Sequence, residues 1–328
     1  IALSTVIVLL IGAAFIKTGQ LTIGQVIALQ LYMISLIEPF WMLSDFILVY
    51  QTGKTSFKKV TELIETTDDM EMSGKEELKH LISIRFQDYY FTYPQAETPS
   101  LRNIAWQIEA GKTYGIVGKT GSGKTTLVRQ LLQQYPVGQG VFQINGKSVG
   151  YYSHQSIEAM IGYVPQEHIL FSKSVKDNIA FGKRNATLSD IEQAIETAAF
   201  SEDLKRMPDG LETLIGERGV SISGGQKQRI SLARAFIRQP EVLILDDSLS
   251  AVGAQTERRI IKNLQDMRAN QTTIIVTHRL SAIQQADWAL VLEDGQIVEE
   301  GTPNQLLNKG GWYAEQYQRQ QHQKGGSK

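Results

Sequence analysis

A glycine-rich segment at residues 118–126 carries the residue types with the clearest chemistry. It reads GKTGSGKTT, which matches the pattern G-x-x-x-x-G-K-[ST]. The glycines allow backbone N–H groups to point toward phosphate oxygens, and Lys124 can place a positive charge on the β- and γ-phosphates. The Thr125 hydroxyl is a potential Mg²⁺ ligand. The predicted nucleotide-binding residues are Gly118, Lys119, Thr120, Gly121, Ser122, Gly123, Lys124, Thr125 and Thr126.

The segments on either side of this loop match the structure that such a loop requires. The apolar run TYGIVG at 113–118 predicts a buried strand, and LVRQLLQQY at 127–135 predicts a helix. A helix that starts at the loop directs the positive end of its dipole toward a bound phosphate. A glycine loop with a structural role only is the alternative, and the strand–loop–helix order disfavours it.

A carboxylate motif lies farther along the chain. Residues 241–247 read EVLILDD, an apolar run that ends in Asp246 and Asp247. An apolar strand that delivers a carboxylate at its end is the usual partner of a phosphate-binding loop. We therefore expect Asp246 to hold Mg²⁺, through a water molecule.

The type of phosphate-binding protein is indicated by residues 222–226, which read ISGGQ. Here the sequence resembles the ATP-binding-cassette (ABC) family, whose signature is usually LSGGQ. The resemblance implies that this segment binds the γ-phosphate of an ATP molecule held by the opposite subunit. It also implies that residues 217–219 (ERG) lie near cytoplasmic loops of an exporter. The alternative is an ordinary helix N-cap. The implied signature residues are Ser223, Gly224, Gly225 and Gln226.

Three further residues take roles from the same resemblance. Gln166, in IGYVPQEHILF, resembles the glutamine that contacts Mg²⁺ and leads toward the membrane domain. His278, in IIVTHRL, resembles the histidine that contacts the γ-phosphate. Tyr93, in YYFTYP, resembles the aromatic residue that stacks on adenine, with Tyr89 and Tyr90 as competitors for that role.

Two positions depart from the family pattern in the hydrolytic region. Active cassettes of the family have Glu, the general base for water, where this chain has Asp247, and Asp where it has Gly253. Asp and Glu have similar pKa values, ~3.9 and ~4.3, so the two residues differ mainly in side-chain length, and Asp is one methylene group shorter. A displacement of about 1 Å can lower a rate on the order of 10²-fold. The pair resembles the degenerate-site subunits of heterodimeric bacterial multidrug exporters, and a working homodimer is the alternative.

The start of the chain predicts membrane helices. Residues 1–50 carry three charged side chains, and apolar runs occupy 1–16 and 25–50. The second run would be ~39 Å long as a helix, which exceeds the ~30 Å hydrocarbon core. The first run has neither the basic segment nor the cleavage site of a signal peptide. It is slightly short for a membrane span and begins with Ile, so we interpret it as part of a transmembrane helix that the start of the chain cuts. Three lysines between residues 54 and 59 predict that the second run ends on the cytoplasmic side of the membrane. A buried helical hairpin of a soluble core is the alternative.

Glu38 and Asp45 are the acidic residues of the second run, and seven residues separate them, so they share a helical face. Pro39 is expected to break or kink the helix. The two carboxylates are consistent with a negatively charged pathway for cationic amphiphiles. An interhelical hydrogen bond for Glu38 and a near-interface position for Asp45 is the alternative.

Composition excludes several other classes. The 328 residues carry a formal net charge of −1, which argues against nucleic acid as the main partner. There is no cysteine, so disulfides and thiolate–zinc sites are absent. We expect an α-helical transmembrane segment followed by an α/β P-loop NTPase cassette with a helical subdomain. The predicted domains are transmembrane helices (1–52), a cytoplasmic helix extension and linker (53–82), the nucleotide-binding domain (83–317) and a polar tail (318–328).

The resemblance as a whole implies the C-terminal part of an ABC exporter half-subunit. Such a protein uses ATP and Mg²⁺ to export hydrophobic or amphiphilic compounds. It pairs with a second half-transporter in a bacterial plasma membrane, crosses the bilayer several times and keeps its cassette on the cytoplasmic side. A homodimeric lipid flippase, a peptide exporter and a non-transport ABC ATPase are the alternatives. The implied catalytic residues are Asp247, His278 and Gln166, and the implied metal ligands are Thr125, Gln166 and Asp246.

Overall fold

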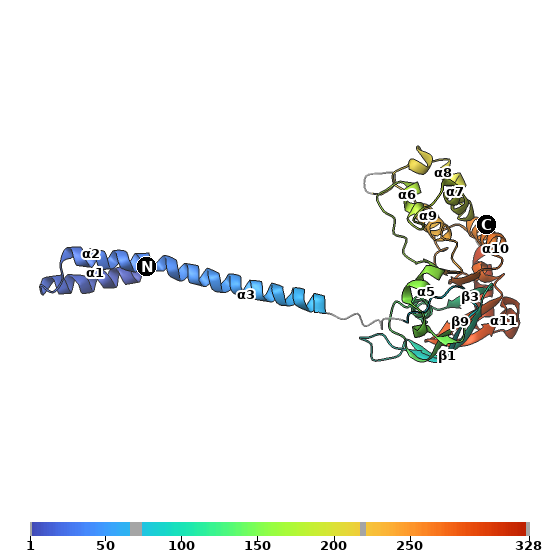
Figure 1. Ribbon diagram of the computed structural model, residues 1–328, viewed down its shortest axis with the longest axis horizontal. Helices are drawn as coiled ribbons and strands as arrows, with labels where there is room; N and C mark the ends of the chain where they lie inside the picture. The colour runs from blue at the N-terminus through green and yellow to red at the C-terminus, as the bar shows by residue number, and fades with distance from the viewer. Residues whose placement is uncertain (1, 66–73, 217–220, 326–328) are drawn as a thin grey trace. The chain divides into compact units, whose positions relative to one another are not determined.

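The computed structural model describes residues 2–65, 74–216 and 221–325 (Figure 1). The chain separates into two compact units, Ile1–Asp68 and Asp69–Lys328. Each unit is described by itself below.

The first unit consists of three helices. They are α1 (Ala2–Lys17), α2 (Ile23–Ser35) and α3 (Ile37–Glu65). Helices α1 and α2 pack closely, since a Cβ atom at Gly12 would lie 2.6 Å from the Val26 side chain. The Gln30 amide also donates a hydrogen bond to Thr5 Oγ1 across the pair, at 2.8 Å.

The second helical segment is long and apolar enough to cross a membrane. Residues Ile23–Glu65 are long and apolar enough by length and composition alone, and only 6% of their most apolar 18-residue window is buried. The interruption between α2 and α3 lies at Leu36, which caps the end of α2. Pro39 lies inside the first turn of α3, where its missing N–H leaves no hydrogen bond unmade. Pro39 has no N–H to donate to the Ser35 carbonyl, four residues earlier, and the helix is interrupted at that place, as the sequence predicts.

The second unit is built on a six-stranded sheet of order β10-β9-β3-β8-β7-β6. All neighbouring strands are parallel except β9 and β10, which are antiparallel. The sheet is labelled in part in Figure 1. Its strands are β3 (Thr113–Gly118), β6 (Ile161–Val164), β7 (Val242–Asp246), β8 (Thr272–Val276), β9 (Trp288–Glu293) and β10 (Gln296–Gly301).

A smaller antiparallel sheet has the order β2-β1-β4-β5. Its apolar face is aromatic, with the Phe86 ring stacked on Phe142 at 4.4 Å between centroids. The strands are β1 (Ser83–Phe91), β2 (Leu101–Glu109), β4 (Gln139–Ile144) and β5 (Lys147–Ser148).

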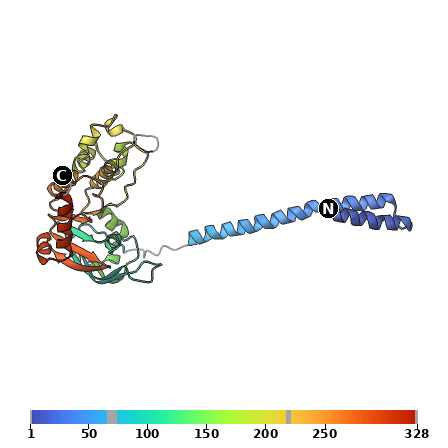
Figure 2. The ribbon, with the colours of Figure 1, turned by 180° about the vertical axis from the view of Figure 1, so that it is seen from behind.

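Helices cover the parallel sheet and also form a separate lobe. The lobe contains α6 to α9 and is the yellow-green region set apart from the strands in both views (Figures 1 and 2). Helix α12 continues across residue 317, where the sequence predicts the start of a polar tail. The helices are α4 (Lys124–Leu131), α5 (His154–Met160), α6 (Val175–Ala180), α7 (Leu188–Thr197), α8 (Ser201–Leu204), α9 (Gly224–Phe236), α10 (Ala254–Met267), α11 (Pro303–Lys309) and α12 (Trp312–Gly325), with short 3₁₀ turns η1 (Val149–Tyr151), η2 (Gly210–Glu212) and η3 (Leu280–Ile283).

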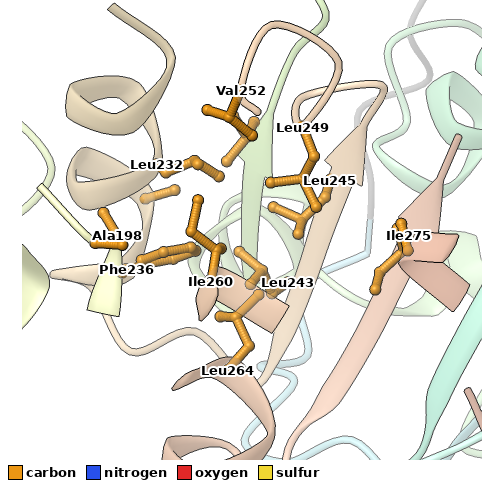
Figure 3. Packing of buried hydrophobic residues seen from close by; sticks show 14 of the residues in the cluster. Ala198, Leu232, Phe236, Leu243, Leu245, Leu249, Val252, Ile260, Leu264 and Ile275 are labelled. Carbon is orange, nitrogen blue, oxygen red and sulfur yellow. The ribbon is translucent and has the colours of Figure 1, made fainter. Parts of the chain in front are cut away.

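Strand β7 lies at the centre of the apolar core. All five of its residues are buried, because parallel strands are covered on both faces. Leu243 and Leu245 point toward the side chains of Ile260 and Leu264 on α10 and Phe236 on α9 (Figure 3). The core therefore joins the sheet that ends in Asp246 to the helix that begins at the signature.

Removing side-chain volume from this core should destabilise the cassette. Leu243 has no exposed surface, so Leu243→Ala should lower the free energy of unfolding by about 2–5 kcal/mol. Chemical denaturation of the purified protein measures the change. Val298→Ala, at a side chain that is 47% exposed on β10, is the control and should cost under about 1 kcal/mol. Equal stability of the two variants would contradict the assignment of β7 to the core.

Candidate functional site

The predicted site residues follow four parallel strands that end at one edge of the sheet. Asp246 pairs in register with Val276, and Val276 pairs with Ile116 on β3. On the other side of β7, Val164 pairs with Leu245. The loops after β3, β6, β7 and β8 therefore leave the same edge, where ligands of open α/β sheets bind. This placement brings the phosphate-binding loop, Gln166, Asp246, Asp247 and His278 to one region of the fold.

The phosphate-binding loop has the backbone that its glycines were expected to provide. Gly118, Gly121 and Gly123 have φ angles of 149°, 82° and 98°, a region that other residues rarely adopt. A Cβ atom at Gly118 would clash with the Leu292 carbonyl oxygen, so the loop also needs the absence of a side chain there. Nothing lies within 4 Å of a Cβ at Gly121, so at this position it is the positive φ angle that favours glycine.

Lys124 lies in the centre of the loop. Its Nζ donates hydrogen bonds to the carbonyl oxygens of Gly118 and Lys119, at 2.9 and 2.7 Å. Burial lowers the pKa of Lys124, and the nearby Asp246 and Asp247 carboxylates act in the opposite direction. The ammonium is thus already held by the loop at the position that the sequence assigns to phosphate recognition.

A cavity of about 390 Å³ opens beside the loop and includes residues that sequence reasoning missed. Arg102 on β2 lines it and adds a second cation to that of Lys124. Asp294 and Gly295, from the turn between β9 and β10, also line it. The Gly295 N–H donates to the Ser122 carbonyl oxygen at 3.1 Å, so this turn supports the loop. These contacts join residues far apart in the chain, and no local motif marks them.

Asp246 is suited to hold a hard cation. Its side chain is buried, and its two carboxylate oxygens lie 3.4 Å from Thr125 Oγ1 and 3.4 Å from the Tyr163 hydroxyl. Burial raises the pKa of Asp246, while these two hydrogen bonds lower it. In the part of the chain that the structure describes, no three His, Cys, Asp or Glu side chains form a metal cluster. A single carboxylate beside a hydroxyl fits Mg²⁺, which commonly combines few protein ligands with substrate phosphates.

Asp247 and His278 contact each other directly. His278 Nδ1 lies 2.9 Å from Asp247 Oδ1, and the Asp247 N–H donates to the Val276 carbonyl oxygen at 2.8 Å. Asp247 has φ 47°, a left-handed conformation that Asp tolerates better than most residues. The two residues assigned by resemblance to hydrolysis therefore form one hydrogen-bonded pair at the sheet edge.

Gln166 and Tyr93 are the remaining predicted residues of this site. Gln166 is exposed two residues beyond the end of β6. The Tyr93 hydroxyl donates to Thr126 Oγ1 at 3.1 Å, which places the ring beside the phosphate-binding loop. Tyr89 is fully buried with its hydroxyl bonded to Gln130, so it cannot stack on a ligand. Tyr90 is 41% exposed, and no described hydrogen bond joins it to the loop.

The signature segment is the N-terminus of α9. Ser223 is its N-cap and accepts a hydrogen bond from the Gln226 N–H at 3.3 Å, while the Gln226 side chain accepts from the Ser223 N–H. This capping box is the ordinary structural role that the sequence left open. Among the described hydrogen bonds and ion pairs, none joins the signature to the phosphate-binding loop of the same chain. Residues 217–219 lie outside the described residues.

The loop after Asp247 lies against the signature helix. The Gln228 amide donates to the Ser248 carbonyl oxygen, and a Cβ at Gly225 would lie 3.3 Å from the Ala251 carbonyl oxygen. Gly253 is the N-cap of α10 and makes no side-chain capping bond. Nothing lies within 4 Å of a Cβ at Gly253, so a carboxylate would fit there.

Taken together, the loop after β3, the carboxylates after β7 and the helical lobe define a P-loop ATPase cassette. Residues 101–250 match the family model described as "ABC transporter". A probable multidrug resistance ABC transporter ATP-binding/permease protein, YheI of Bacillus subtilis (strain 168), is 46% identical over 311 residues, which are 94% of this chain and 53% of that protein. An ATP-dependent lipid A-core flippase of Photobacterium profundum is 35% identical, over 94% of this chain and 53% of that protein.

A solved structure of an ABC exporter is also similar to this chain. The structure of a bacterial Atm1-family ABC exporter with ATP bound has a TM-score of 0.77 and 31% identity, and covers 92% of this chain and 53% of that one. The chain therefore spans about half the length of these relatives. Over the shared length, the chain is similar to ABC exporters. The predicted fold class, a helical N-terminal segment followed by an α/β ABC ATPase cassette, is confirmed.

Loss of the loop lysine should weaken nucleotide binding. Lys124→Ala removes the main phosphate charge, and a charge-assisted hydrogen bond of about 1.5–3 kcal/mol corresponds to roughly 10- to 100-fold in affinity. Photolabelling with an azido-ATP analogue measures the effect. Lys147→Ala, at a lysine over the Tyr151 ring, is the control and should label normally. Unchanged labelling of Lys124→Ala would show that the loop is not the nucleotide site.

Proposed function

We propose that this chain is the C-terminal part of an exporter half-subunit that couples ATP hydrolysis to the export of hydrophobic or amphiphilic compounds. The observation that carries the proposal is the sheet edge, where Lys124, Asp246, Asp247 and His278 lie together in a cassette that follows an apolar helix. The name of the Bacillus relative supports a multidrug substrate range. The predicted domain limits and the position in a bacterial plasma membrane, with several crossings and a cytoplasmic cassette, belong to the same proposal.

The residues of the edge have separable tasks in this proposal. Thr125, Asp246 and Gln166 would hold Mg²⁺, which supplies positive charge against the β- and γ-phosphates. Lys124 and the loop N–H groups bind the phosphates, and Tyr93 stacks on adenine. Asp247 accepts the proton of the attacking water, and His278, held by Asp247 at 2.9 Å, contacts the γ-phosphate. The Ser223 turn contributes to the ATP site of a partner cassette.

We further propose that this chain's own ATP site is degenerate and that its partner is a different half-transporter. The support is the pair of departures, Asp247 for Glu and Gly253 for Asp. The Asp247 carboxylate also contacts the His278 imidazole, so a water molecule must compete with the imidazole for that carboxylate. The site then binds ATP but turns it over slowly, and the productive site lies on the partner's phosphate-binding loop.

A lipid-exporting homodimer is a second candidate function. The similarity to the lipid A-core flippase favours it, because that relative is matched over the same share of this chain as the multidrug relative. Isolation of the native protein discriminates between the two candidates. A second, different subunit in equal amount supports the heterodimer, and a single subunit supports the homodimer.

The two ATP sites should respond differently to substitution. Ser223→Ala combined with Gly224→Asp places a carboxylate at the helix N-terminus and reverses its favourable electrostatics toward phosphate. This change should nearly abolish the steady-state ATPase activity of the assembled transporter. Asp247→Asn should cost less than about three-fold, because the degenerate site contributes little turnover. A true general base contributes about 10²–10⁴-fold, so a loss on that scale in Asp247→Asn would refute the degenerate site.

The acidic pair on α3 should affect substrate choice. Glu38→Gln with Asp45→Asn removes two carboxylates from one helical face, so export of cationic dyes should fall several-fold more than export of neutral dyes. Dye efflux from cells or vesicles measures the ratio. Glu62→Gln, on the charged half of the same helix, is the control. An equal loss for both dye classes would instead support a structural role.

A further inference from the structure

The helical lobe holds a carboxylate against the signature segment, and no motif predicts it. Asp203, on α8, lies 23% exposed and Arg229, on α9, lies 11% exposed. Asp203 Oδ2 accepts a hydrogen bond from Arg229 Nη2 at 2.7 Å. Its other oxygen, Oδ1, accepts from the side-chain amide of Gln226 at 3.2 Å. One carboxylate therefore contacts two residues of the helix that the signature begins.

The Gln226 side chain is fixed at both ends by this arrangement. Its Oε1 accepts from the Ser223 N–H at 2.9 Å, and its Nε2 donates to Asp203. The Ser223 N–H selects the amide oxygen on one side, and the Asp203 carboxylate selects the amide nitrogen on the other, so the two contacts together fix the orientation of the amide. Without Asp203, the Ser223 N–H alone would hold the Gln226 amide, and the capping box would lose the second contact that orients it.

Arg229, the other partner of Asp203, lies close to the signature glycine Gly225. The guanidinium lies 3.4 Å from the position of a Cβ at Gly225 and 6.0 Å from the centre of the Phe200 ring. Asp203 neutralises a cation that is nearly buried, which keeps the arginine at this place. Ser223 and Gly224 remain exposed, so the supported turn presents its free face away from the lobe.

We propose that Asp203 is a positioning residue for the signature, which it acts on through Gln226 and Arg229. The inference rests on the proposed function, since it assumes that Ser223–Gln226 binds the γ-phosphate at the partner's site. Asp203 holds the turn in its binding conformation before the two cassettes meet. Its loss lowers the rate of hydrolysis and leaves ATP binding at this chain's own loop unchanged.

The test is the Asp203→Asn variant of the full-length transporter. It removes the charge and one acceptor at nearly unchanged volume. We expect kcat for ATP hydrolysis to fall about ten-fold, the lower end of the effect of losing a supporting partner, with photolabelling of the own loop unchanged. Asp203→Glu keeps the carboxylate and should recover at least half of the lost kcat. Glu212→Gln, which breaks the exposed Lys176–Glu212 pair of the same lobe, is the matched control and should keep full activity.

A double variant guards against simple misfolding. Asp203→Leu with Arg229→Met removes both charges together and leaves no unpaired buried ion. It should fold, as judged by normal photolabelling, and should still lose most of its ATPase activity because the Gln226 amide is no longer held. Normal kcat in either Asp203→Asn or the double variant would overturn the inference.

Failure of the inference is distinguishable from failure of the proposed function. The Ser223→Ala, Gly224→Asp variant is measured in the same assay. If it also keeps normal activity, the signature does not bind nucleotide and the proposed function fails. If it loses activity while Asp203→Asn keeps it, the signature role stands and the positioning role of Asp203 is wrong.

Discussion

Parallel pairing of β7 with β6 and β8 is the constraint on which the cassette depends. Parallel strands run in one direction, so every strand of the group reaches the same edge at its carboxyl end. The pairing of Asp246 with Val276 sets how far β7 and β8 extend toward that edge. The strands themselves are apolar and buried on both faces, so polar chemistry is excluded until each strand ends. A one-residue shift of β7 would turn Asp246 to the other face of the sheet, away from Thr125 and Tyr163.

The two halves of the proposed nucleotide chemistry lie on parts of the cassette that differ in physical character. The sheet edge is preorganised by strand register, and its polar side chains already contact one another, as in the Asp247–His278 pair. The signature depends on a helix start, whose free N–H groups are satisfied by a cap and whose outer face stays exposed. The Gln228 contact to the Ser248 carbonyl connects the two parts within one chain. The two parts are therefore joined by a buried hydrogen bond within one chain.

The sequence predicts the elements that depend on local chemistry and misses those that depend on distant contacts. The loop at 118–126 could be found because glycine conformation and the lysine position are properties of consecutive residues. Asp246 could be found because an apolar run that ends in a carboxylate is equally local. Arg102, Asp203 and Asp294 could not, because each acts only where separate segments meet. The interruption at Leu36 could also be predicted, because Pro39 cannot donate a hydrogen bond to the Ser35 carbonyl, four residues earlier.

Helix α3 also has a mechanical property. Its 29 residues run without interruption from an apolar half, which contains Phe46, to a charged half, which contains Lys58 and Lys59. At 1.5 Å per residue the rod is ~43 Å long, so a tilt of ~10° at one end displaces the other by about 7 Å. A long helix bends only gently unless something interrupts it, and α3 continues without a break through Gly53. A small change in the tilt of α3 can thus move its charged end by about the length of a side chain.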